Sequence, residues 1–289
     1  MVAVKELFTV VAVLIAVTLL APHKPAGAAA DVRGRPGTSL FAQSAAEALR
    51  CDFSDTDISY LLLDARSGQI LASSWQNPEL PIPLGSLAKP FTALAYGEQH
   101  DFRYPSHVCL GTASGCWRPA GHGAVDLTSA IAYSCNSYFR TLTEDLDSED
   151  VSATAGRFRI DSPDPEAEGM ALAGVGSSWR VAPLRMARAY IELSRERDRP
   201  AVQQILDGMA KSAQQGTGAE VGRVLPGRSV LVKTGTAPCT HARHAQGDGL
   251  AIAMLPADDP KILLMVRVHG VPGSQAAKTA GQMLRRIQD

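Results

Sequence analysis

Residues 229–268 read SVLVKTGTAPCTHARHAQGDGLAIAMLPADDPKILLMVRV. Three runs in this stretch are rich in β-branched and other apolar residues, and glycine, aspartate and proline residues separate them. Apolar runs of about four to eight residues, bounded by turn residues, are typical of strands. The stretch therefore predicts three successive strands, at Ser229–Thr234, Gly249–Leu255 and Ile262–Val268, the first of which ends at Gly235.

A second strand-rich stretch lies near the other end of the sequence. Ile58–Asp64 (ISYLLLD) is predicted to be a buried strand, and Gln69–Ser73 the strand that returns after a turn. Apolar spacing predicts helices at Phe41–Arg50, Ser86 to about His100, Val125–Leu142, Pro183–Ser194, Val202–Gln214 and Gln275–Ile287. We expect an α+β fold: one antiparallel sheet assembled from both chain ends and covered by helices, with a helical region inserted between them. Asp145–Ala167 is predicted to be a polar surface region.

Composition narrows the class of protein. The 289 residues are 45% hydrophobic and 20% charged, which is typical of a globular chain. With 28 basic and 29 acidic side chains the net charge is −1, so there is no electrostatic argument for a nucleic-acid partner.

The first thirty residues differ from the rest. Lys5 precedes the apolar run Leu7–Ala21, and small residues follow at 26–30. This order is typical of a secretory signal peptide, although an uncleaved N-terminal membrane anchor stays open. A run of 15 residues is shorter than the roughly 20 that a membrane span needs, which favours the signal peptide. We therefore expect an extracytoplasmic protein, at the periplasm or cell surface, with residues 1–30 as signal or anchor, 31–56 as linker and 57–289 as one domain.

Five cysteines bear on the chemistry outside the cytosol, where disulfides form. They are Cys51, Cys109, Cys116, Cys135 and Cys239. The spacing allows a local disulfide between Cys109 and Cys116, and the odd count leaves at least one thiol over. No spacing matches a zinc pattern, and His241 and His244 are best interpreted as a polar loop, so no metal and no organic cofactor is expected.

Three short motifs point to nucleophilic catalysis. The first is Ser86-Leu87-Ala88-Lys89, at the start of a predicted helix. Residues three apart lie on one helix face about 5–6 Å from each other, so the Lys89 amine can take the proton of the Ser86 hydroxyl. That requires a lowered lysine pKa, which burial and a second cation such as Lys233 would provide. The helix start also offers backbone N–H groups to a developing oxyanion.

The other two motifs supply a relay and a binding edge. Ser134-Cys135-Asn136 places a hydroxyl that can pass on a proton and an amide that can bind a peptide. Lys233-Thr234-Gly235-Thr236 ends a predicted strand, to which an extended peptide can add. Lys233, Thr234 and Thr236 would hold a terminal carboxylate, and Gly235 would let the substrate backbone approach.

With these motifs in this order, the sequence resembles the penicillin-binding protein transpeptidase domains. The segments 83–92, 121–139, 174–184 and 216–218 are similar to those of the family as well, so the likeness runs from about residue 57 to 287. It implies a transpeptidase/β-lactamase-like fold and acyl transfer on the D-Ala-D-Ala peptides of peptidoglycan. It also implies a Ser86 acyl-enzyme, covalent inhibition by β-lactams, an oxyanion hole formed by the N–H groups of Ser86 and Thr236, and cell-wall synthesis proteins as partners.

Other functions are compatible with the same three motifs. A D,D-carboxypeptidase uses the same motifs. A serine β-lactamase needs a group that activates water, and Glu166-Ala167-Glu168-Gly169-Met170 lacks the E-x-x-L-N form expected for it. A β-lactam or muropeptide sensor without turnover is the alternative from another class. We interpret His122 as a structural loop residue, and Trp117 and Trp179 as packing or cleft-rim residues.

Overall fold

The computed structural model describes residues 40–239 and 247–288. The predicted signal or anchor at 1–30, residues 31–39 of the predicted linker, and the pair His241 and His244 lie outside the described residues. Within the described ranges no helix combines the length and the apolar character that a membrane span requires.

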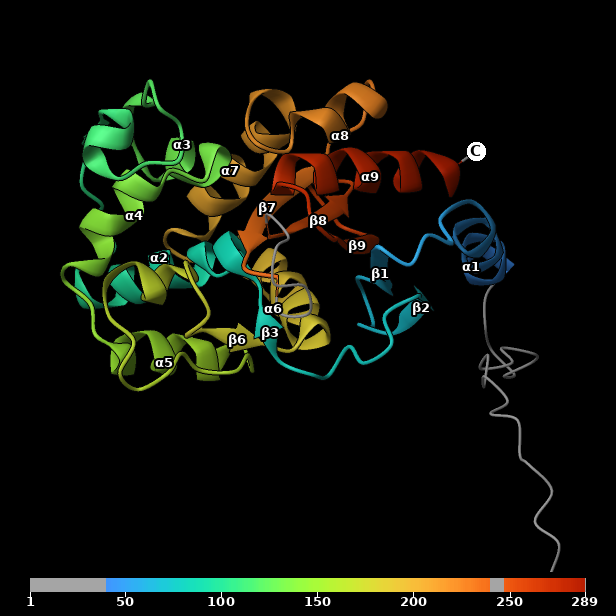
Figure 1. Cartoon of the computed structure of the whole chain (residues 1–289), viewed down its shortest axis with the longest axis horizontal. Coiled ribbons are helices and arrows are strands. Elements are labelled where there is room, and N and C mark those ends of the chain that lie inside the picture. The colour runs from blue at the N-terminus through green and yellow to red at the C-terminus, as the bar shows by residue number, and fades with distance from the viewer. Residues whose placement is uncertain (1–39, 240–246, 289) are drawn as a thin grey trace, which may run out of the picture. The chain divides into compact units, whose positions relative to one another are not determined.

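One five-stranded antiparallel sheet organises the fold, in the order β2-β1-β9-β8-β7. Its strands are β1 (Ile58–Asp64), β2 (Ile70–Ser73), β7 (Leu231–Ala237), β8 (Asp248–Leu255) and β9 (Ile262–Val268). In Figure 1 the blue N-terminal strands lie beside the orange and red C-terminal strands. The α+β prediction, with a sheet built from both chain ends, is therefore confirmed. β7 continues through Gly235 instead of ending there, and it forms one edge of the sheet.

The strands β1, β8 and β9 are apolar over most of their length because both faces of the sheet are buried there. In β1, Leu61 and Leu63 belong to one core cluster, whereas Tyr60 and Leu62 belong to the other. Leu61 pairs with Met265 of β9, so the register places the two chain ends side by side at the centre of the sheet.

Helices cover both faces. One core contains residues of α1 (Leu40–Asp52), α8 (Ala219–Val224) and α9 (Gly273–Arg286). Ala45 and Leu49 of α1 are buried in it, so part of the segment predicted to be linker packs in this core with residues of the sheet. The other core holds the remaining helices, which are α2 (Lys89–Gln99), α3 (Leu127–Tyr133), α4 (Asn136–Thr143), α5 (Ser148–Arg157), α6 (Pro183–Arg195) and α7 (Val202–Gln215).

Short elements connect these helices. They are the two-stranded pair β3 (Ile82–Pro83) with β6 (Arg180–Val181), the hairpin β4 (His107–Cys109) with β5 (Gly123–Val125), and the 3₁₀ turns η1 (Gly85–Leu87), η2 (Gly111–Ser114) and η3 (Gly169–Ala173). Most of the predicted polar surface region at 145–167 is exposed or half-buried, but it also contains a helix that the sequence did not predict. α5 lies there, begun by the Asp147 capping box, and it buries Val151 and Ala155.

Candidate active site

Ser86 lies in the 3₁₀ turn η1 and is partly exposed. The sequence predicts a helix from Ser86 onward, but α2 begins only at Lys89, with Pro90 in its first turn, where the missing N–H costs no hydrogen bond. The fully buried Tyr190 of α6 donates a hydrogen bond of 2.8 Å from its hydroxyl to the Leu87 carbonyl. This bond ties the turn to α6, and no pattern in the sequence predicts it.

Two glycines let the Ser86 turn pack directly on the edge strand β7. Gly85 has a φ of +56°, and a Cβ there would lie 2.3 Å from the Thr236 carbonyl oxygen. A Cβ at Gly235 would lie 2.6 Å from the Leu84 carbonyl oxygen. Both distances are too short for any side chain, so the first and third motifs meet backbone to backbone. Gly235 is therefore required by the fold of the site, in addition to the role in substrate approach that the sequence predicts.

Ser134 occupies a break between two helices. The helical stretch predicted at Val125–Leu142 is divided into two helices, because α3 ends and α4 begins around a left-handed residue. Ser134 has φ 50° and ψ 44°, and Cys135 is extended. Asp126 caps the start of α3, where its side chain accepts a hydrogen bond of 2.8 Å from the Ser129 N–H. The break turns Ser134 and Asn136 toward Lys89.

Lys89 is completely buried and bonded to this turn. Its Nζ donates to Asn136 Oδ1 at 2.6 Å and to the Ser134 carbonyl at 2.9 Å, and lies 3.5 Å from the Ser134 hydroxyl. Trp117 donates from its indole nitrogen to the same carbonyl at 3.1 Å. The first two motifs thus form one connected hydrogen-bond network.

Lys233 approaches Ser134 from the other side. It too is completely buried, and its Nζ donates to the Ser134 hydroxyl at 3.1 Å and to the Thr234 carbonyl at 2.7 Å. The Ser134 hydroxyl therefore lies between two lysine amines. The Thr234 hydroxyl bonds Thr217 at 2.5 Å, and the exposed Thr236 accepts a hydrogen bond of 3.0 Å from the Gly273 N–H.

Burial controls the protonation of both amines. Within the described residues neither lysine forms an ion pair with a carboxylate, so their charged forms are not compensated. Burial lowers the pKa of Lys89 to about 7, which agrees with the direction that the sequence predicts. Burial, and then the charge of Lys89, lower the pKa of Lys233 well below its ordinary range. An uncharged lysine near neutral pH is a competent proton acceptor.

The two tryptophans that the sequence suggests for packing or the cleft rim differ in burial. Trp117 is 53% exposed and lies at the edge of a hollow of about 240 Å³ that Thr217 and Tyr133 also line, next to the third motif. Trp179 is buried and donates to the Asp161 carbonyl at 2.7 Å, which is a packing role. Cys109 and Cys116 are both free thiols, so the disulfide that the spacing allows between them is not formed.

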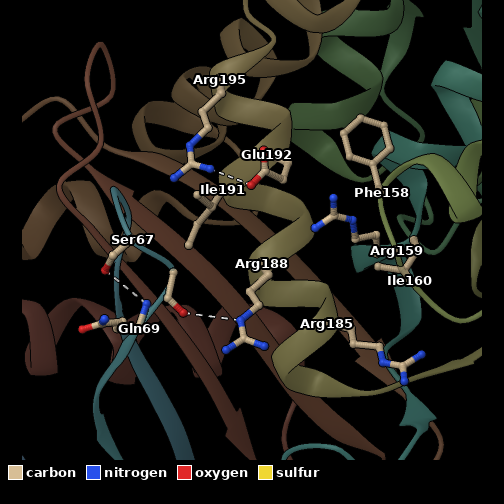
Figure 2. A pocket seen from close by; sticks show the side chains of 11 residues that line it. Ser67, Gln69, Phe158, Arg159, Ile160, Arg185, Arg188, Ile191, Glu192 and Arg195 are labelled. Atoms are coloured by element: carbon tan, nitrogen blue, oxygen red, sulfur yellow. Dashed lines mark hydrogen bonds and ion pairs between the residues drawn. The ribbon is translucent and has the colours of Figure 1, made fainter.

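A larger hollow lies elsewhere and contains no motif residue. It has a volume of about 630 Å³, and four exposed arginines line it, which are Arg159, Arg185, Arg188 and Arg195. Figure 2 shows Arg185, Arg188 and Arg195 along α6, and Arg159 beside Phe158 and Ile160. Arg185 pairs with Asp161 and Arg195 with Glu192, so the hollow is a solvated, partly compensated basic surface. Size alone therefore does not mark the reactive site of this protein.

Comparison with known proteins agrees with the geometry. Residues 58–289 match the model of the penicillin binding protein transpeptidase domain. The chain belongs to this family. No curated protein matches the sequence, whereas solved structures of penicillin-binding proteins share its fold.

Three such structures illustrate the likeness. Pseudomonas aeruginosa PBP2, in complex with WCK 5153, superposes with a TM-score of 0.69 at 19% identity, over 87% of this chain and 74% of that one. The transpeptidase domain of Burkholderia pseudomallei penicillin-binding protein 3 gives 0.66 at 17%, over 86% and 91%. Helicobacter pylori PBP2, in complex with MreC, gives 0.68 at 18%, over 84% and 62%. At these identities the likeness shows the fold alone.

Proposed function

We propose that this penicillin-binding transpeptidase domain is a D,D-transpeptidase, which acts on the D-Ala-D-Ala peptides of peptidoglycan through a Ser86 acyl-enzyme. The observation that carries the proposal is the Ser134 hydroxyl held between the two buried amines of Lys89 and Lys233. The turn that carries Ser86 packs against the same strand that supplies Lys233. These contacts support Lys89 as base and Ser134 as proton relay, next to the turn that carries the proposed nucleophile and to a strand edge that could receive a peptide.

Acylation follows from these groups. The uncharged Lys89 amine takes the proton of the Ser86 hydroxyl as Oγ forms a bond to the carbonyl carbon of the penultimate D-Ala. The backbone N–H groups of Ser86 and Thr236 stabilise the resulting oxyanion. The peptide C–N bond then breaks, and the departing D-Ala amine receives the proton from Lys89 through the Ser134 hydroxyl. Lys89 returns to its uncharged form, and an ester on Ser86 remains.

The edge strand β7 and its neighbours would bind the peptide. Because β7 pairs only with β8 among the residues that the structure describes, its other backbone edge could receive an extended substrate. The substrate carboxylate would lie against Lys233, Thr234 and Thr236, and its charge would raise the pKa of Lys233 and keep that amine protonated. The Asn136 amide would bind the peptide backbone of the stem.

The acyl acceptor distinguishes a D,D-transpeptidase from a D,D-carboxypeptidase. An amine from a second stem peptide gives a cross-link, and water gives the carboxypeptidase product. We favour the amine because the matching family is that of transpeptidase domains. β-Lactams would acylate Ser86 in the same way as the peptide.

Location and partners follow from the same proposal. Peptidoglycan lies outside the cytoplasm, and the pattern at 1–30 is that of a signal peptide or anchor. We propose an extracytoplasmic protein that works with cell-wall synthesis proteins, as H. pylori PBP2 is found in complex with MreC.

Covalent labelling tests the reaction class. Wild type incubated with a fluorescent penicillin should show one adduct by intact mass, on the peptide that contains Ser86, and Ser86→Ala should show none. Ser67→Ala, in the β1–β2 turn, is the matched control and should label like wild type. Labelling of Ser86→Ala, or a folded wild type that never labels, would overturn the proposal.

A second assay defines the product. A pentapeptide stem supplied with an amine acceptor should yield the cross-linked product. Release of D-Ala with hydrolysis alone would identify a carboxypeptidase, and acylation without any turnover would identify a sensor.

A further inference from the structure

Three buried thiols and one imidazole converge beside the Ser134 turn, although the sequence spacing C-x6-C-x5-H-x12-C follows no familiar metal pattern. The residues are Cys109, Cys116, His122 and Cys135, and their ligand atoms all lie within 4.8 Å of one another. The three cysteines are 2%, 4% and 0% exposed. They come from the end of β4, the loop between β4 and β5, and the break between α3 and α4.

Three of the distances between these atoms match those expected for a tetrahedron around zinc. The Nδ1 atom of His122 lies 3.5 Å from the sulfur of Cys109 and 3.5 Å from that of Cys116. The sulfurs of Cys116 and Cys135 are 3.9 Å apart. With Zn–S bonds of about 2.3 Å and Zn–N bonds of about 2.0 Å, tetrahedral angles put neighbouring S and N atoms about 3.5 Å apart and two S atoms about 3.8 Å apart. A set of three thiolates and one imidazole is typical of structural zinc.

Tight backbone turns bring the residues of the cluster together. Gly111 and Gly121 have φ values of +72° and +73°, and a Cβ on Gly121 would lie 2.2 Å from the Cys109 carbonyl oxygen. The Cys116 N–H bonds the Gly111 carbonyl at 2.9 Å, which closes the loop and returns Cys116 to Cys109.

The His122 ring is held in position as well. It stacks on Tyr133 with ring centres 5.3 Å apart and an interplanar angle of 7°, and it meets Trp117 edge-on at 5.5 Å. Both aromatic residues belong to the segments that carry the cysteines. His122 therefore has a specific structural role, because its Nδ1 atom faces the thiols.

We propose that Cys109, Cys116, His122 and Cys135 form a zinc site, and that the metal fixes the turn that carries Ser134 and Asn136. Cys135 lies between these two residues, so a bond from its sulfur to zinc ties the second motif to the β4–β5 loop. Trp117, next to Cys116, braces the same turn through the Ser134 carbonyl. Binding of Zn²⁺ displaces the protons of the three thiols into solvent and leaves a site with a net charge of −1. The metal site stands by itself, whereas its positioning role rests on the proposed function.

Metal content tests the site directly. The full chain, purified under reducing conditions and loaded with Zn²⁺, should retain about one zinc per chain after desalting. The protein loaded with Co²⁺ should show the visible absorption bands and the thiolate charge-transfer band of tetrahedral cobalt. A chain that retains neither metal, or a mass that shows a disulfide within the cluster of the purified reduced protein, would overturn the site.

Variants assign the ligands. Cys135→Ser and Cys116→Ser should each weaken Zn²⁺ binding by more than about 100-fold, since even loss of a group that only supports a ligand costs about 10–100-fold. Cys116→His should restore much of the affinity, and Cys51→Ser, which changes an exposed thiol outside the cluster, should leave it unchanged. Circular dichroism checks that each variant folds. If a serine variant does not fold, the cobalt spectrum of wild type still decides the question, and a folded Cys135→Ser that keeps full affinity would contradict the assignment.

Acylation kinetics test the positioning role separately. Removal of zinc by a chelator should lower the acylation rate with a fluorescent penicillin by about 10–100-fold, and added Zn²⁺ should restore it. An unchanged rate in the metal-free protein would overturn the positioning role but not the site. Failure of wild type to acylate at all would overturn the proposed function while the metal measurement stands.

Discussion

Two basic regions of this protein have opposite chemical characters. Four arginines lie at the surface in the hollow of Figure 2, where water and the carboxylates of Asp161 and Glu192 stabilise their charge. The site beneath the Ser86 turn gathers two lysines, both completely buried and both bonded to one serine hydroxyl. The first region has more positive charge, whereas burial in the second region lowers the pKa values of its two lysines.

The comparison shows why buried lysine suits proton transfer. A guanidinium stays protonated in almost any environment, whereas a buried lysine amine loses its proton readily. Burial lowers the pKa of Lys89 to about 7, so a large share of the molecules hold an uncharged base at neutral pH. The arginine hollow can bind anions but cannot accept a proton, so only the lysine site can activate a serine.

The largest expected effect comes from removing one amine from the buried region. Lys89→Met keeps much of the side-chain volume but removes the base, and we expect the acylation rate to fall by about 10³-fold or more. Stopped-flow measurement with a fluorescent penicillin would give the rate constant. Arg188→Met, in the hollow of Figure 2, is the matched control and should change the rate less than about twofold.

The acylation rates of Lys89→Met and Arg188→Met test whether the two basic regions differ in chemistry. If both substitutions slow acylation equally, the buried region has no special chemistry and the assignment of Lys89 as base is wrong. Thermal unfolding of Lys89→Met should stay close to that of wild type. The substitution leaves Asn136 Oδ1 without its donor, but it also removes the desolvation of a buried amine.

The next effect concerns how the nucleophile is held beside the lysines. Gly235→Ala places a Cβ 2.6 Å from the Leu84 carbonyl oxygen, so β7 and the Ser86 turn must move apart. We expect a loss of about 1–3 kcal/mol in the free energy of unfolding and an acylation rate about 10²-fold lower. Denaturant melts and labelling kinetics measure the two effects.

Gly156→Ala provides the control for that substitution. Gly156 lies in α5, and a Cβ there would meet nothing within 4 Å, so alanine should be neutral or slightly stabilising. Wild-type kinetics in Gly235→Ala would show that the backbone contact between the motifs does not control the reaction.

The sequence was sufficient for the fold and for the residues of the three motifs, because apolar periodicity and turn residues are local signals. It failed where tertiary contacts override a local pattern. Residues 125–142 have helical periodicity throughout, yet the chain breaks at Ser134, whose carbonyl accepts bonds from Lys89 and Trp117. The Tyr190 contact to Leu87 joins residues 103 apart, and no spacing rule reports such a pair.

The cysteine cluster was missed for a related physical reason. Familiar metal patterns keep ligands close together along the chain, but here two left-handed glycine turns and a helix break bring the four ligands together. In the sequence the same residues suggested at most a local disulfide. The distances among the sulfur and nitrogen atoms, which only the structure supplies, separate the two interpretations.

The smallest effect is a pH dependence that sharpens the contrast between the two regions. Because Lys89 acts as base only when uncharged, the acylation rate should fall about tenfold for each pH unit below 7 and level off above about 8. The folded protein binds this proton less tightly than the unfolded chain does. Lys89 therefore destabilises the fold most below pH 7, and the unfolding free energy should rise as the pH increases from about 7 toward 10.5. Lys89→Met should lose the part of this rise that Lys89 contributes and keep the part that the buried Lys233 contributes, whereas Arg188→Met should keep both. A wild-type rate that stays flat between pH 5 and about 8 would show that the amine of Lys89 is not the group that takes the proton.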